Sequence, residues 1–436
     1  MLTFEILDWA DAGDARGVEL RATWARLRIS VGQLCATRVV SRPAAGTRDH
    51  IFVPLYPLAE WLVANWWFLQ GEIKTPRSHY ALRHSLKFSG DGFAFPDLAI
   101  KPLGHVCEIE ASKRLLQHQE LEFLAEGRAY AATSDVMNSI ERFVTAVLQR
   151  LDDSGVTATP LHEEWRSVVK VRRDAEEVAF CLLSASLGED PYSVGPGLTR
   201  SLERWGSSIE QETLQEICAA LTSSTLERGL RWIDRTAASL KEAHSPWTSL
   251  PELKEKLVAD SAARTEVDQP WLLGYADARR LRKSLKLNGD VFSSFYDLLD
   301  VFRPEGDASV GVAYEPPDVT GLDALAQVSK TGAPGFLITK RGDDAKKFAF
   351  MRSLYDYFRL AKGTLAIATR SHSQIQQASR AFAAEFLAPS HLLRGRIAAE
   401  YLGGDEISEL ADYFGVSEFV IQHQVVNHHL ADVIYE

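Results

Sequence analysis

The chain has 436 residues, of which 46% are hydrophobic and 25% are charged, and its formal net charge is −11. These fractions are typical of a globular protein, and the length predicts two or three domains because a single core rarely grows beyond about 250–300 residues. The negative charge repels phosphate, so nucleic-acid binding would need a local basic patch. Apolar runs such as PLAEWLVANWWFL are shorter than the roughly 20 residues of a membrane-spanning helix.

The N-terminal segment and the cysteines both predict a cytoplasmic location. The N-terminal MLTFEILDWADAG carries acids in place of the basic segment of a signal peptide. Cys35, Cys107, Cys181 and Cys218 lie far apart, with no CxxC pair. We therefore expect reduced thiols in a cytoplasmic protein, with neither a disulfide framework nor a zinc knuckle and with no membrane partner.

Strands and helices alternate over the first part of the chain, residues 1–155. β-Branched and aromatic residues predict the early strands, and Pro57 begins a predicted helix that runs to residue 71. Ser134 is expected to cap a later helix. The apolar stripe of that helix is formed by Val136, Ile140, Phe143, Val144, Val147, Leu148 and Leu151. We expect a mixed α+β N-terminal domain here.

Two further strands in this domain raise a nuclease hypothesis. GFAFPDLAI (92–100) and HVCEIEA (105–111) are joined by KPLG, which predicts a hairpin. Pro96-Asp97 followed by Glu108 and Glu110 resembles the PD-(D/E)xK nuclease motif, in which such acids hold Mg²⁺. The lysine position is Glu110, and Lys113 is displaced by three residues. The alternative interpretation is an antiparallel hairpin whose polar residues point outward.

Helical patterns dominate residues 156–262, and the last region, 263–436, mixes helices with strands. QETLQEICAALTSSTLERGLRWIDRTAASL (211–240) is expected to be helical, and GFLITK (335–340) is expected to be a strand in an αβ segment. The predicted fold class is α+β, with a mixed N-terminal domain, a helical middle region and a C-terminal domain.

Four segments of the last region, in order, resemble the ImmA/IrrE family of zinc metallopeptidases. PWLLGYADARRLRKSLKL is similar to the family's first helix, and GFLITKRGDDAKKFAF is similar to the strand, turn and "RRFTLA" segment that follow. SRAFAAEFLAPSHLL and ISELADYFGVSEFVIQHQVVNHHL are similar to its two closing segments. The resemblance implies a zincin-like fold for this domain.

The same resemblance locates the family's zinc site and shows that its ligands are replaced. Members carry HExxH, whose histidines bind Zn²⁺ and whose Glu acts as general base. KKFAFM fixes the alignment and puts Arg352 at the first His, Ser353 at the Glu and Asp356 at the second His. The third ligand falls in QIQQAS (374–379), which contains no acid. We expect no zinc and no peptidase chemistry, and a substrate groove that keeps Tyr355, Phe382 and Glu385.

Other polar residues near this segment are weaker candidates. Asp356, His372, Glu385 and His391 are the local groups that could bind a metal, and helix-surface or packing roles are expected for them. Asp356 would pair with Arg352 on the helix surface. The cluster His423, His428 and His429 does not fall on one helix face, so solvated histidines are expected.

The C-terminal ISELADYFGVSEFVIQHQ also has the spacing of a helix–turn–helix motif. A second helix that reads DNA should offer basic residues to phosphates, yet SEFVIQHQVVNHH contains no Lys or Arg. A packing role is therefore favoured over DNA binding.

The sequence thus favours an inactive metallopeptidase-fold protein that acts by protein recognition. The family resemblance implies prokaryotic regulation, toxin–antitoxin or phage-defence circuitry, with a protein partner that a neighbouring gene could encode. The alternatives are a Mg²⁺-dependent nuclease using Asp97, Glu108 and Glu110, a DNA-binding regulator, and an atypical active metallo-endopeptidase. No cofactor is predicted outside the nuclease alternative, and the oligomeric state is not predicted.

Overall fold

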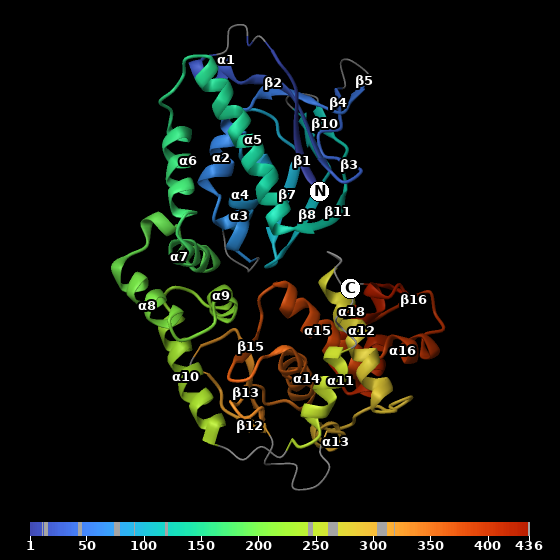
Figure 1. The fold of residues 1–436 in the computed structure, drawn as a ribbon. Helices are drawn as coiled ribbons and strands as arrows, with labels where there is room; N and C mark the ends of the chain where they lie inside the picture. Colours follow the sequence, from blue (N-terminus) through green and yellow to red (C-terminus); the bar gives the residue numbers. More distant parts are fainter. Residues whose placement is uncertain are drawn as a thin grey trace. The chain divides into compact units, whose positions relative to one another are not determined.

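A computed structural model describes residues 1–10, 12, 16–41, 46–73, 79–90, 92–117, 121–242, 247–259, 269–302, 312–317 and 319–434. The chain forms two compact units, Met1–Glu203 and Arg204–Glu436. Each unit combines several helices with small, mostly antiparallel sheets (Figure 1). The predicted α+β class is therefore confirmed.

The first sheet of unit 1 contains the strands predicted nearest the N-terminus. β1 (Leu2–Trp9) and β2 (Trp24–Val31) pair antiparallel along most of their length. β3 (Leu34–Cys35) and β6 (Ile51–Pro54) also pair with β2. Every second residue of β2 from Ala25 to Val31 is buried, as the alternation of apolar residues requires.

Two more sheets complete the β structure of unit 1. One has the order β5 (Gly46–Arg48), β4 (Val39–Ser41), β10 (Leu121–Phe123), β9 (Arg114–Leu116). The other has the order β11 (Gly127–Ala132), β8 (Val106–Ser112), β7 (Asp97–Pro102). The predicted hairpin is confirmed as the antiparallel pair β7–β8.

The helices of unit 1 pack on these sheets. α5 (Thr133–Asp153) buries every residue of its predicted apolar stripe. Its N-cap is Ala132, which makes no side-chain cap, so the predicted capping role of Ser134 is wrong. The predicted helix 57–71 is interrupted between α2 (Tyr56–Ala64) and α3 (Phe68–Gly71). The remaining helical segments of this part are α1 (Val18–Ala22), α4 (Tyr80–His84) and η1 (Leu86–Phe88).

The predicted helical middle region is divided between the two units. α6 (Pro160–Val171) and α7 (Ala175–Ser186) bury Leu161, Val168 and Cys181 in the core of unit 1. After η3 (Pro191–Ser193) and α8 (Pro196–Gly206), α9 (Gln211–Ala220) and α10 (Leu226–Glu242) belong to unit 2. The expected boundary between residues 262 and 263 lies outside the described residues.

Unit 2 is built around a four-stranded sheet. Its order is β12 (Val312–Tyr314), β14 (Pro334–Ile338), β13 (Leu322–Val328), β15 (Leu365–Thr369). β12 runs parallel to β14, and the other pairs are antiparallel. Every residue of β13 is buried, which indicates that both faces of the sheet centre are covered.

Helices cover this sheet and extend beyond it. α14 (Asp343–Arg359) lies on the sheet and packs against α15 (Gln374–Leu387), and α12 (Pro270–Ser284) packs along α15. The other helices of the unit are α11 (Leu250–Ala259), α13 (Phe295–Asp300), α16 (Ser390–Arg396), α17 (Gly404–Phe414) and α18 (Glu418–Asn427). β16 (Tyr401–Leu402) and β17 (Asp432–Val433) form a small parallel pair. None of the helices within the described ranges is long and apolar enough to cross a bilayer.

Candidate functional site

The segment in which the sequence predicts a metal site without its ligands forms α14, which is central to unit 2. Asp343 and Asp344 in its first turn complement the helix dipole. From Ala349 to Phe358 every residue is buried, because the sheet, α13 and α15 surround the helix. Polar side chains in this stretch must therefore find partners inside the protein.

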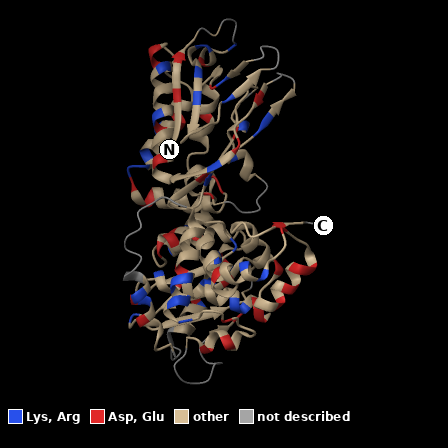
Figure 2. Ribbon diagram, turned by 90° about the vertical axis from the view of Figure 1, so that its right-hand side faces the viewer, with Lys and Arg blue, Asp and Glu red and all other residues tan. Residues whose placement is uncertain are grey.

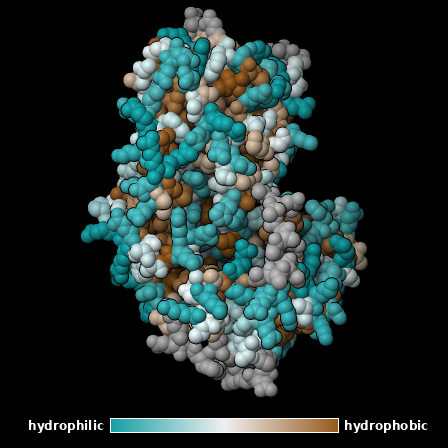
Figure 3. Space-filling model, in the orientation of Figure 1, coloured by the Kyte–Doolittle hydropathy of each residue, from teal (hydrophilic) through white to brown (hydrophobic). Residues whose placement is uncertain are grey.

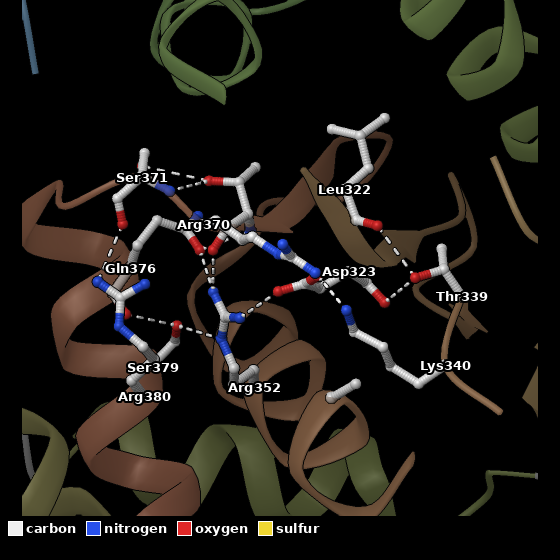
Figure 4. Close-up of polar contacts among 12 residues, drawn as sticks. Leu322, Asp323, Thr339, Lys340, Arg352, Arg370, Ser371, Gln376, Ser379 and Arg380 are labelled. Carbon is white, nitrogen blue, oxygen red and sulfur yellow. Dashed lines mark hydrogen bonds and ion pairs between the residues drawn. The ribbon is translucent and has the colours of Figure 1, made fainter. Parts of the chain in front are cut away.

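Arg352 is buried in α14, and its guanidinium is held by hydrogen bonds from several elements. It donates to the carboxylate of Asp323 (3.0 Å) on β13 and to the backbone oxygen of Thr369 (2.6 Å) on β15. It also donates to Gln376 Oε1 and to Ser379 Oγ (3.3 Å), both on α15. Figure 4 shows these groups converging on the guanidinium, which is therefore fixed at a junction of helix, sheet and second helix.

Asp323 links this cluster to further basic residues. Its carboxylate forms ion pairs with Lys340 and, at 3.7 Å, with the exposed Arg370 (Figure 4). Gln376 accepts a hydrogen bond from the Thr369 backbone N–H (2.8 Å) and donates to the backbone oxygen of Ile367 (2.8 Å). We name Asp323, Arg352, Thr369, Gln376 and Ser379 the Arg352 cluster. Four hydrogen bonds and the ion pair with Asp323 therefore commit the Arg352 guanidinium to the protein itself.

Ser353 and Asp356 are the other two residues predicted at the positions of the metal motif, and their hydrogen-bond partners differ. The Ser353 hydroxyl donates to the backbone oxygen of Ala349 (2.9 Å), one turn earlier in α14. Asp356 is 2% exposed, and neither carboxylate oxygen has a hydrogen-bond partner among the described residues. The predicted surface pair of Asp356 with Arg352 is wrong, since both side chains are buried and Arg352 bonds elsewhere.

Burial also changes the acidity of Asp356. Loss of water around the carboxyl group raises its pKa to about 7, although the charges of Arg352 and Arg359 favour ionisation. The nearby carboxylate of Glu216 on α9 acts in the same direction as burial. A buried carboxyl that titrates near neutral pH in a cavity is a candidate functional group.

Asp356 lines a cavity of about 260 Å³ within unit 2. The surrounding residues come from α9, the end of α14, β15 and the start of α15. They are Glu210, Glu212, Thr213, Glu216, Arg359, Leu360, Ala361, Thr364, Ala366, Ile367, Ile375 and Gln376. We name this space the Asp356 cavity.

Glu216 is the second acid close to Asp356 in the cavity wall. Its carboxylate accepts a hydrogen bond from Ser371 Oγ (3.1 Å), and desolvation raises its pKa. Thr213, one turn earlier on α9, donates to the backbone oxygen of Leu365 (3.1 Å) on the edge strand β15. These two bonds attach α9 to the sheet and fix the position of Glu216.

The three residues predicted to line a groove lie in the packed interior. Tyr355 and Phe382 are 2% and 0% exposed, and their rings lie 5.0 Å apart. Glu385 is buried and accepts hydrogen bonds from Arg279 (2.8 Å), Ser390 (2.9 Å) and Gln424 (2.9 Å). The prediction of an open groove at these residues is therefore wrong, because each side chain joins helices together.

Glu385 is ionised at neutral pH despite its burial. Desolvation opposes the charge, but the neighbouring His428 imidazole and the hydrogen bond from Arg279 outweigh it and lower the pKa to about 2. His428 lies 3.2 Å from the carboxylate and beside the Tyr275 ring, so the prediction of a solvated histidine is wrong for this residue.

The remaining metal candidates do not come together. His391 is exposed and lies 3.4 Å from the backbone oxygen of Asn288, whereas Glu385 is committed to the helix contacts above. His372 directly precedes the cap of α15. Within the described residues, no three His, Cys, Asp or Glu side chains are arranged to hold a metal ion.

The nuclease acids of unit 1 are separated by the register of their hairpin. Asp97 lies opposite Ser112, whereas Glu108 lies opposite Lys101. Glu108 is thus four residues along β8 from the partner of Asp97, about 13 Å at the usual rise per residue. The hairpin therefore does not place Asp97 beside Glu108, because the register decides which residues meet.

Each of these acids also has a basic partner. Lys101 contacts Glu108 (3.0 Å) and Glu110, and Lys87 contacts Asp97 (2.6 Å). Lys113 pairs with the exposed Glu126 instead. The hairpin face is a network of compensated charges.

The helix–turn–helix segment forms α17 and α18, joined through Gly415 with a left-handed backbone (φ 59°). Gln424, one of the amide side chains in this segment, is buried against Glu385 and the Ala388 backbone oxygen. Acidic and basic residues are interspersed over the described parts of both units (Figure 2). These observations favour packing over DNA contact for α18.

Comparisons with known proteins give no relative. No protein-family model, no curated protein and no solved structure matches this chain.

Sequence reasoning missed two residues on which the site depends, Asp323 and Glu216. Asp323 lies in the mostly apolar strand LDALAQV, and a charge in such a run indicates a buried partner. Glu216 had no comparable signal, because an acid on an amphipathic helix is usually solvated. The strand β15 over LAIAT was missed as well.

Proposed function

We propose that this chain is a non-catalytic protein that resembles the ImmA/IrrE metallopeptidases in its C-terminal region and acts by binding a protein partner. The circuits implied by that resemblance are prokaryotic regulation, toxin–antitoxin control and phage defence. The observation that carries the proposal is the Arg352 cluster at the aligned metal position.

The residues present do not fit a zinc ion. A guanidinium cannot lose its proton in a protein and carries a positive charge of its own. The Ser353 hydroxyl donates a hydrogen bond to a helix carbonyl. Serine has no carboxylate, so it cannot replace the glutamate that acts as general base. Gln376, in the segment of the third ligand, offers an amide that already contacts Arg352 and Thr369. Arg352, Ser353 and Gln376 therefore supply neither a zinc ligand set nor a general base.

Binding remains available where catalysis is not. The Asp356 cavity has buried acceptors that lack a partner among the described residues, and Figure 3 shows small hydrophobic groups scattered among hydrophilic residues on the face in view. A fold without catalytic residues can still select a protein segment through such a cavity.

Metal analysis together with partner capture tests the proposal. The full chain, purified without chelator, is expected to hold zinc far below one ion per chain and to leave a mixed peptide library intact. Capture from the native host followed by reconstitution with the purified partner is expected to give a stoichiometric complex.

Two results would contradict it. One is a full equivalent of zinc that is lost in Asp356→Ala; the other is peptide hydrolysis that the same substitution abolishes. A reconstituted complex that forms equally well with Ala361→Phe, which narrows the Asp356 cavity, would place recognition elsewhere on the protein.

A further inference from the structure

The unpartnered buried polar atoms at the Asp356 cavity are all hydrogen-bond acceptors. Both carboxylate oxygens of Asp356 lack a partner among the described residues, although the side chain is 2% exposed. A second cavity of about 200 Å³ shares Glu210, Thr213 and Thr364 with the first and contains Gln327. Gln327 Oε1 is another buried acceptor without a partner in the described chain. A ligand that completes these groups must donate hydrogen bonds.

The charge of the cavity wall selects a cation. Four acidic residues, Glu210, Glu212, Glu216 and Asp356, face one basic residue, Arg359, among the described lining residues. Arg359 is exposed, and its guanidinium lies over the Tyr355 ring at 5.6 Å. Arg352 lies near Asp356 and Arg380 lies near Glu216, but both donate hydrogen bonds to atoms of the protein.

The size and lining of the cavity fit an aliphatic stem with a charged head. A volume of about 260 Å³ is smaller than the 300–1,000 Å³ of typical small-molecule sites. Apolar side chains form one wall, namely Leu360, Ala361, Ala366, Ile367 and Ile375. Lysine and arginine combine such a stem with N–H donors at the end.

We propose that the Asp356 cavity receives a lysine or arginine side chain of the protein partner, with the cationic head against Asp356 and Glu216. This inference rests on the proposed function and names the chemistry of the segment that is recognised. A metal ion is not the favoured occupant, because no group of three metal-ligating side chains surrounds the cavity among the described residues. An anion would meet the two carboxylates and is disfavoured.

Short peptides with one altered side chain test the inference on the full chain. Acetylated Gly-Gly-Lys-Gly-Gly amide, its arginine form and its norleucine form are titrated by calorimetry. The lysine or arginine form is expected to bind at least about tenfold more tightly than the norleucine form, since a charge-assisted hydrogen bond is lost in the latter. Asp356→Asn is expected to remove that difference, and Glu409→Gln, an exposed acid on α17, is expected to keep it.

Small cations separate the side chain of a partner from a free amine. n-Butylammonium has the stem and the donors, whereas tetramethylammonium has the charge without N–H groups. At equal ionic strength, only n-butylammonium is expected to raise the Tm of the wild type. Binding of n-butylammonium without binding of either cationic peptide would overturn the assignment to a protein side chain.

Other outcomes are equally decisive. Equal affinity for the lysine, arginine and norleucine peptides, or an unchanged preference in Asp356→Asn, would overturn the inference. If Asp356→Asn does not fold, Ala361→Phe narrows the cavity without touching the acid and is expected to weaken cationic peptides. A partner complex that forms while all cationic peptides fail leaves the proposed function standing and removes only this inference.

Discussion

At the scale of single residues, Arg352 and Asp356 lie one helical turn apart and differ in whether their buried charges have hydrogen-bond partners. Arg352 is a buried cation whose donors are bonded to Asp323, Thr369, Gln376 and Ser379. Asp356 is a buried acid with no hydrogen bond from the described residues. A bonded buried charge supports the structure, whereas an unbonded one costs stability and is retained for another reason.

Arg352→Met is expected to destabilise unit 2 by about 3–5 kcal/mol, because it removes the buried hydrogen bonds from the guanidinium to Asp323, Thr369 and Gln376. Arg370→Met provides a matched control, since Arg370 pairs with the same carboxylate but is 69% exposed. Its expected cost is below about 1 kcal/mol. Denaturant unfolding of both variants measures the two values, and equal costs would contradict the structural role given to Arg352.

Asp356 predicts a specific pH dependence of stability. Its pKa is about 7 in the folded protein against an ordinary value of 3.8, so the folded state binds the proton more tightly. Its favourable contribution is complete below about pH 4 and is lost as the pH rises to 7. The groups that face it are Arg352 and Arg359 on α14 and Glu216 on α9.

Asp356→Asn is therefore expected to be more stable than the wild type at pH 8, by up to about 4 kcal/mol. The difference should shrink toward pH 4, where the wild-type carboxyl is protonated. Unfolding at the two pH values checks this. A variant that is less stable than the wild type by the same amount at both would show that the carboxylate is satisfied.

At the scale of elements, α12 crosses α15, the helix that packs against α14. Gly274 lies at this crossing, and a Cβ there would meet the Ala378 backbone oxygen at 2.1 Å. The glycine therefore permits a close approach of two helix backbones. Glu385 and Arg279 then tie the same pair of helices together beyond the crossing.

Gly274→Ala is expected to destabilise the protein by about 1–3 kcal/mol or more, because the added methyl group pushes the helices apart. Gly395→Ala on α16 is the control, since a Cβ there meets nothing within 4 Å. That change is expected to be neutral or stabilising by about 0.5–1 kcal/mol. Thermal unfolding of both proteins measures the contrast, and a tolerated Gly274→Ala would mean that the crossing can widen.

Element prediction from sequence succeeded where periodicity was strong and failed where long-range contacts decide. The apolar stripe of α5 and the β7–β8 hairpin follow from local patterns. The register of that hairpin, which separates Asp97 from Glu108, depends on pairing that no local pattern fixes. Likewise, no local pattern indicates that Glu216 lies close to Asp356.

At the scale of the whole molecule, the two units have separate hydrophobic cores. The core of unit 1 takes in α6 and α7, which the sequence analysis assigned to a separate helical middle region. Helical patterns cannot reveal which core a helix joins, because the apolar stripe looks the same in either case. The local patterns of strands and helices were sufficient for the fold class but not for this division.

The Arg352 cluster also has a consequence for the history open to such a chain. A single codon change from Arg352 to a metal-binding residue would remove the hydrogen bonds that Asp323, the Thr369 backbone oxygen and Gln376 accept from the guanidinium. A variant that has lost the guanidinium but does not yet bind a metal would be less stable than the present protein. The Arg352 cluster therefore disfavours a stepwise mutational route from this sequence to a metal site.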